Sequence, residues 1–90
     1  MKQPVYIGND TYINGDTIIS IIDSSRPMAK KLKKKAKEEY NLLDFTCGMG
    51  TGSVILLSDN RVILSNRTPF QIVNEIREDE IKKEKRVQEQ

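Results

Sequence analysis

The 90-residue sequence has no histidine, no tryptophan and only one cysteine, and these absences exclude several classes of function. A single cysteine, Cys47, cannot form an intramolecular disulfide, which is typical of proteins in a reducing cytosol. Without histidine the chain has neither a Ser-His-Asp nor a Cys-His nucleophile, and the usual transition-metal sites are nearly excluded. The composition therefore predicts a protein that is not an enzyme and that needs no cofactor or small-molecule substrate.

Long apolar runs are also absent. No segment approaches the roughly 18–20 apolar residues that a membrane span needs. Polar and strand-like residues, and not the apolar core of a signal peptide, follow Met1. We therefore expect a cytoplasmic protein without a membrane partner.

Positive charge is concentrated in one segment, where six lysines fall within the eight residues 30–37. The whole chain has 15 basic and 13 acidic residues, a net charge of +2, so removing these six lysines leaves 9 against 13, or −4. A patch of this density attracts polyanions, because a lysine near a phosphate displaces a condensed counterion. The alternative is a solvated helix face that only keeps the protein soluble.

Six short β-rich segments are separated by turn residues, and they predict strands at residues 5–7, 11–13, 17–22, 42–46, 53–58 and 61–65. Asn14 and Gly15 both tolerate positive φ, so they predict a hairpin between the second and third strands. The third strand is almost continuously apolar, which is typical of a central strand that is covered on both faces.

A helix is expected between the third and fourth strands. Pro27 suits its first turn, with Ser25 or Arg26 at the cap, and the helix runs to about residue 40. Its apolar positions form a narrow stripe at Met28, Leu32, Ala36 and Tyr40, with Ala29 beside it. We therefore expect one side of this helix to pack on a sheet and the lysines to face solvent or a partner.

A second helix is expected to begin at Pro69, because Thr68 can cap it and Gln71 falls where a capping-box partner belongs. The order of the elements predicts an α+β fold, with a small, twisted, mostly antiparallel sheet and two helices. We expect one domain at residues 1–77. A charged tail at residues 78–90 is expected to be partly helical or frayed.

Two features have both a chemical and a structural interpretation. Gly48, Gly50 and Gly52 would let a phosphate come close, but their spacing is not that of a dinucleotide fingerprint. They also lead into a strand and not into a helix, so a flexible inter-strand loop is favoured.

Asp44 lies inside an expected strand, and a cap or turn role is favoured for it over catalysis.

Three stretches, residues 12–22, 43–48 and 53–65, resemble the RemA family of small bacterial regulators of extracellular-matrix and biofilm genes. The most specific part of the resemblance is Gly48, which follows the Asp-x-Thr strand at residues 44–46. After it comes a hairpin at residues 54–65 of the form VI-x-x-x-D-x-x-VILS. The resemblance implies a fold akin to LytTR-type domains, a transcription regulator that binds double-stranded DNA, and a closed homo-oligomeric ring. Ring assembly agrees with the thin core that a chain of this length can bury.

At four positions the chain departs from the family's pattern. The resemblance implies DNA-contacting arginines just before the third strand and in the loop after residue 48, where this chain has Thr17, Met49, Gly50 and Gly52. These residues lack the forked donors with which arginine reaches phosphates and base edges. The DNA contacts of the family are therefore not carried over residue by residue.

The lysine-rich segment is the remaining candidate for a nucleic-acid-binding surface. We hypothesise that phosphates are bound by Lys30, Lys31, Lys34 and Lys37, helped by Arg26. Lysine binds phosphate as a point charge with little base-reading geometry, so binding is expected to tolerate sequence changes and to depend steeply on salt. The alternative is an assembly protein of the same family that keeps the ring and no longer binds DNA.

Overall fold

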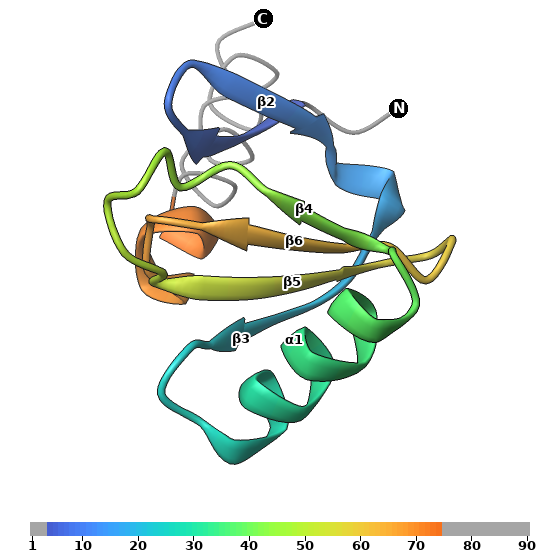
Figure 1. Ribbon diagram of the computed structural model, residues 1–90. Coiled ribbons are helices and arrows are strands. Elements are labelled where there is room, and N and C mark those ends of the chain that lie inside the picture. Colours follow the sequence, from blue (N-terminus) through green and yellow to red (C-terminus); the bar gives the residue numbers. More distant parts are fainter. Residues whose placement is uncertain (1–3, 75–90) are drawn as a thin grey trace, which may run out of the picture.

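A four-stranded sheet forms the middle layer of the computed structural model, which describes residues 4–74 (Figure 1). Its strands are β3 (Ile18–Asp23), β4 (Leu42–Asp44), β5 (Ser53–Leu57) and β6 (Val62–Ser65). Their order is β3-β5-β6-β4, with β5 antiparallel to both of its neighbours and β4 parallel to β6. The predicted α+β fold with a mostly antiparallel sheet is confirmed.

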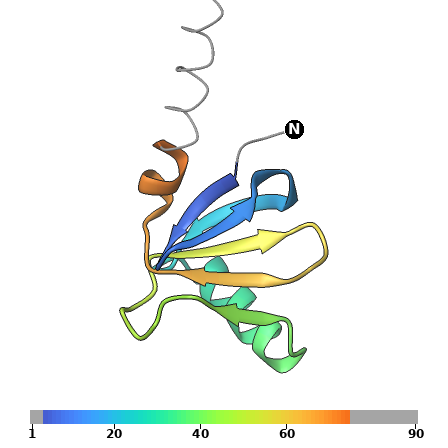
Figure 2. The same cartoon turned by 90° about the horizontal axis from the view of Figure 1, so that it is seen from above.

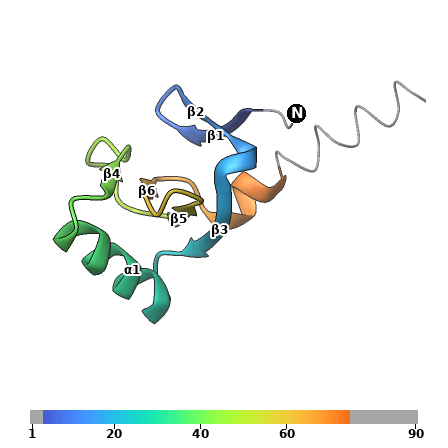
Figure 3. The same cartoon turned by 90° about the vertical axis from the view of Figure 1, so that its right-hand side faces the viewer.

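One face of this sheet is covered by α1 (Pro27–Glu38), which lies below the sheet in Figures 1 and 3. Ala29 and Ala36 are seven residues apart, so they fall on the same side of the helix. Both alanines are buried in a cluster with Val54, Val62 and Leu64. Two short side chains at the contact thus let α1 lie close to the two central strands.

The predicted apolar stripe of this helix is only partly correct. Leu32 is half-buried toward the sheet, but Met28 is 60% exposed and Tyr40 is 96% exposed. The helix ends at Glu38, so Tyr40 lies beyond it and does not continue its spacing. Ala29 is the first residue of α1 that packs on the sheet. Met28, its neighbour in the sequence, points about 100° away from it around the helix and therefore stays largely in solvent.

The opposite face is covered by a hairpin of β1 (Pro4–Gly8) and β2 (Thr11–Asn14), together with a helical segment at residues 69–74 (Figure 2). The central strands are continuously apolar because half of their side chains pack on α1 and the other half on this second layer. The buried Ser65 hydroxyl donates a 2.6 Å hydrogen bond to the Ile7 carbonyl and joins β6 to the hairpin. The buried apolar cluster on this side contains Val5, Ile7, Ile55, Leu57, Ile63 and Ile72.

The capping box predicted for the second helix is confirmed. The backbone amide of Thr68 donates to Gln71 Oε1 at 3.0 Å, and the backbone amide of Gln71 donates to Thr68 Oγ1 at 3.2 Å. Ile72 is fully buried and anchors this helix start on the sheet. The charged tail predicted at residues 78–90 lies outside the described residues.

The hairpin predicted at Asn14 and Gly15 is wrong. β2 pairs with β1, and the turn between them is made by Asn9 and Asp10, whose φ values are 51° and 57°. Two adjacent residues of positive φ are typical of the type I′ turn, which matches the twist of the strands. Asn14 instead caps a 3-10 helix, Gly15–Thr17, by accepting a hydrogen bond from a backbone amide two residues along. This short helix carries the chain from the hairpin layer to the sheet (Figure 3).

β3 is an edge strand, which corrects the prediction that the apolar segment 17–22 is central. An irregularity of pairing between Ile18 and Ser20 removes Ile19 from the regular register. As a result Ile18 and Ile21 pack against the same buried cluster, whereas Ile19 is 61% exposed. The continuous apolar run therefore reflects a bulge as well as two covered faces.

Gly52, just before β5, has no room for a side chain. A Cβ at this position would lie 2.6 Å from the carbonyl oxygen of Arg67 and 2.9 Å from that of Asn66. We expect Gly52→Ala to lower the free energy of unfolding by about 1–3 kcal/mol, because backbone atoms must shift to relieve the overlap. Urea denaturation followed by circular dichroism measures this change.

Thr51→Ala is the matched control for this substitution, because it removes atoms from the neighbouring residue of the same loop. We expect it to change stability by less than about 0.5 kcal/mol. A Gly52→Ala protein as stable as wild type would contradict the close approach of the two backbone segments.

Candidate nucleic-acid interface

All six lysines of α1 are exposed, and they occupy the sides of the helix that turn away from the sheet. With 3.6 residues per turn, Lys34 lies opposite the buried alanines, and Lys30, Lys31 and Lys37 lie on either side of it. The four lysines selected from the sequence therefore share one solvent-facing surface. Two further lysines flank it, and we define the lysine face as Lys30, Lys31, Lys33, Lys34, Lys35 and Lys37.

No lysine of this face makes an ion pair with a carboxylate among residues 4–74. The ion pair seen in that part of the chain joins Arg61 to Asp59, and these residues lie in the turn between β5 and β6. Within the described part of the chain, the charge of the lysine face is therefore not held in ion pairs and can attract an external polyanion.

Arg26 begins this surface as the N-cap residue of α1, and its exposed side chain makes no capping hydrogen bond. The pKa of the nearby Asp23 is lowered by hydrogen bonds from the backbone and hydroxyl of Ser25, and the charge of Arg26 adds to this effect. Glu38 and Glu39 are exposed at the other end of the helix. Acidic groups thus lie at both ends of α1, and the six lysines lie between them.

Asp44, at the end of β4, has the turn role that the sequence favoured. Its Oδ1 accepts a 2.6 Å hydrogen bond from the Thr46 hydroxyl and a 2.9 Å bond from the Thr46 amide. These two bonds lower the pKa of Asp44, burial opposes them, and the charge of Lys33 adds to the lowering. Asp44 is therefore a stabilised carboxylate at neutral pH and a poor general acid.

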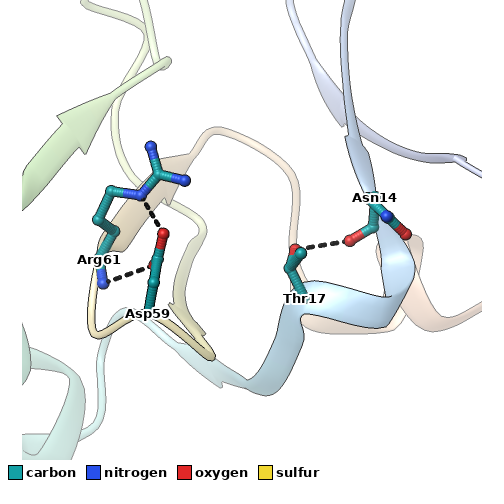
Figure 4. A network of polar contacts seen from close by, with 4 residues as sticks. All are labelled: Asn14, Thr17, Asp59 and Arg61. Carbon is teal, nitrogen blue, oxygen red and sulfur yellow. Dashed lines mark hydrogen bonds and ion pairs between the residues drawn. The ribbon is translucent and has the colours of Figure 1, made fainter.

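Thr17, where the resemblance implies an arginine, is the last residue of the 3-10 helix Gly15–Thr17. In Figure 1 the blue ribbon of this short helix lies at the end of the sheet opposite the green loop of residues 48–52. The Thr17 hydroxyl donates a 2.7 Å hydrogen bond to the Asn14 carbonyl (Figure 4). Its carbonyl accepts a 2.8 Å bond from the Ser58 amide, which places Thr17 beside the β5–β6 turn. Within one subunit, the structure does not bring this position together with the loop.

Arg61, in the same turn, is a basic residue that the sequence reasoning overlooked. Its Nε donates to Asp59 Oδ2 at 2.6 Å and its amide donates to Asp59 Oδ1 at 3.1 Å. The backbone hydrogen bond is the main cause of the lowered pKa of Asp59. Figure 4 shows the two terminal guanidinium nitrogens pointing away from the carboxylate. The Asp-x-Arg spacing was the signal in the sequence for this oriented guanidinium.

The loop of residues 48–52 joins β4 to β5, as predicted, and does not lead into a helix. Gly48 and Gly50 have φ values of 78° and 85°, which favour glycine over a residue with a side chain. At Gly52 a backbone carbonyl occupies the space of a Cβ. The backbone conformation at Gly48 and Gly50 and the close approach at Gly52 therefore each give a structural reason for glycine in this loop.

The helices within residues 4–74 all fall short of the length and apolar content of a membrane span. The described part of the chain is thus a small α+β domain with a strongly basic helix on its outside. A family model with the description RemA-like, extracellular matrix regulatory protein A-like, matches residues 5–76. The chain belongs to the RemA-like family.

Relatives from other organisms are similar over most of their length. A protein of Fervidobacterium nodosum is 34% identical over 93% of this chain and 90% of its own length. A protein of Thermotoga neapolitana is 34% identical over 94% and 92%, and one of Finegoldia magna is 38% identical over 70% and 76%. All three carry provisional names as regulatory proteins.

Proposed function

We propose that this chain is a cytoplasmic regulatory protein of transcription that assembles into a homo-oligomeric ring and binds double-stranded DNA through its lysine face. The observation that supports this most directly is the exposure of all six lysines of α1, none of which forms an ion pair with a carboxylate among residues 4–74. Family membership and the names of the relatives support a regulatory role. The description of the family makes extracellular-matrix genes the proposed targets.

The mode of contact follows from the chemistry of lysine. Its ammonium group is a compact point charge, so it neutralises phosphates without the fixed fork that arginine offers to base edges. The lysine face is therefore expected to hold the DNA backbone and to discriminate little between sequences. In a ring, several lysine faces would contact the same DNA at once. After the first contact forms, the others form at a high effective concentration, so weak contacts together give a higher affinity.

Exposed apolar side chains support the proposed assembly of several copies of the chain into a ring. Large hydrophobic residues on the surface of the described chain include Phe70 at 74% exposure, Met49 at 66% and Ile19 at 61%. Such side chains are commonly covered at contacts between subunits. The same observation, with the missing arginines, favours the alternative of an assembly protein that no longer binds DNA.

A salt titration separates the two functions. Four phosphate contacts per binding unit predict that the affinity for a labelled duplex falls about 100-fold between about 50 and 200 mM salt. Fluorescence anisotropy measures the affinity, and light scattering in the same buffers measures the mass. A stable oligomer that fails to bind the duplex at the lowest salt would favour the assembly protein. A strict monomer at high micromolar concentration would contradict the ring in both functions.

A further inference from the structure

Tyr40 is a strained and almost fully exposed residue just beyond the lysine face. Its φ of 58° lies in the left-handed region, and it is 96% exposed. The Asn41 amide donates to the Ala36 carbonyl at 2.8 Å, and the Tyr40 amide donates to the Lys37 carbonyl at 3.3 Å. These bonds form a Schellman motif, in which the left-handed position is usually glycine.

The fold has no evident use for a tyrosine at this position. A Cβ in the left-handed conformation is unfavourable, and an exposed ring buries almost no apolar area in return. The aromatic contact found within residues 4–74 joins Tyr6 to Tyr12 and does not include Tyr40. Strained residues that bring no structural gain are concentrated at functional sites. The backbone bond to Lys37 holds this aromatic residue one turn beyond the last lysine of the lysine face, with Glu38 and Glu39 between them in the sequence.

We propose that Tyr40 stacks on an unpaired nucleobase of a DNA strand whose phosphates lie on the lysine face. This inference rests on the proposed function and names its partner more closely. A row of cations beside an aromatic ring is the arrangement with which proteins hold single-stranded nucleic acid. Bases inside a duplex are stacked on one another, so the ring meets a base only at an overhang, a bubble or a flipped nucleotide.

A second copy of this chain fits the ring of Tyr40 less well. The six lysines precede it in α1, and Glu38 and Glu39 are its exposed neighbours. Lysine and glutamate are depleted in the cores of protein interfaces, and a two-fold contact between copies at this position would bring like charges together. The two carboxylates also repel phosphates from the immediate surroundings of the ring. The uncharged base, and not the backbone, is therefore the part of the strand that suits this position.

The test compares two labelled duplexes with overhangs of equal length, one with bases and one with abasic sites. Both carry the same number of phosphates, so the lysine face contributes equally to the binding of each. Wild type is expected to bind the base-bearing overhang about 5- to 150-fold more tightly. Tyr40→Leu is expected to lose this preference, whereas Tyr40→Phe is expected to retain it because the phenyl ring still stacks.

Two further variants separate binding from folding. Tyr40→Gly relieves the left-handed strain, so its Tm is expected to rise by about 4 °C while its preference for bases disappears. The chain contains no tryptophan, so Tyr40→Trp introduces a single fluorescent reporter. Its emission is expected to be quenched by the base-bearing overhang and unchanged by the abasic one.

Three results would overturn the inference. A Tyr40→Leu protein that keeps the full preference for bases would remove the ring from the contact and leave the proposed function intact. A lower mass of Tyr40→Leu in light scattering would place the ring between copies of the chain. Failure of wild type to bind either duplex at low salt would end both this inference and the proposed function.

Discussion

Replacing Lys30, Lys31, Lys34 and Lys37 together with glutamine is expected to weaken duplex binding by at least about 100-fold at moderate salt. Each lost phosphate contact lowers the slope of log affinity against log salt by about 0.9, so the slope falls by up to about 4. The four side chains are exposed and glutamine is nearly as good a helix former as lysine, so α1 is expected to persist. Anisotropy titrations at several salt concentrations measure the affinity and the slope.

The charge-preserving control replaces the same four lysines with arginine. Its affinity is expected to stay within a few-fold of wild type, because phosphate neutralisation depends on charge. The mass of both variants in solution is expected to equal that of wild type. If the glutamine variant bound DNA as tightly as wild type, the lysine face would be excluded, and Arg61 with the loop of residues 48–52 would be the next candidates.

Ile55→Ala is expected to have the largest effect on stability. Ile55 is fully buried in the middle of β5, at the centre of the cluster between the sheet and the hairpin. Removing its side chain leaves a cavity and is expected to lower the free energy of unfolding by about 2–5 kcal/mol. A chain of 90 residues has only about 5–13 kcal/mol in total, so this loss is large. Urea denaturation measures it.

Ile19→Ala is the matched control, because it makes the same chemical change at a side chain that is 61% exposed. Its effect on the unfolding of the dilute protein is expected to stay within about 0.5 kcal/mol. Equal losses at both positions would contradict the bulge that separates Ile19 from the core. A change in mass, without a change in the unfolding of the dilute protein, would place Ile19 at a contact between subunits.

Elements whose interactions lie within a few residues could be predicted from the sequence. The capping box of Thr68 and Gln71 spans one helical turn, and both partners of its hydrogen bonds are therefore visible in the sequence. The turn role of Asp44 depends on Thr46, only two residues away. The exposure of the six lysines could also be predicted. A helix on the outside of a sheet buries only one side, and its few apolar residues fill that side, so the lysines must lie on the others.

The hairpin at Asn14 shows where local preference is insufficient. Asn14 and Gly15 suit both a hairpin turn and the start of a short helix, and packing of the hairpin on the sheet selects the helix. The turn at Asn9 and Asp10 has a similar preference and is used as a hairpin. The choice between these two turns depends on contacts between residues that are distant in the sequence.

The residues of the candidate site were also only partly predictable from the sequence. Lys30, Lys31, Lys34 and Lys37 were identified by composition, because charge density is a property of the sequence. Tyr40 was assigned to the apolar stripe, since its spacing of four from Ala36 fits a helix that continues. The Schellman motif ends the helix two residues earlier and turns the ring into solvent.

By itself the sequence determined the small α+β class, the number of strands, the places of the helix starts and the basic character of α1. These depend on composition, periodicity and hydrogen bonds between near neighbours. Only the tertiary structure decided that β6 lies between β5 and β4, that β3 is an edge strand, and that Ile19 and Tyr40 face solvent. The reason is physical: strand order and side-chain exposure are set by the burial of distant apolar surfaces against one another, and no local pattern records which surfaces will meet.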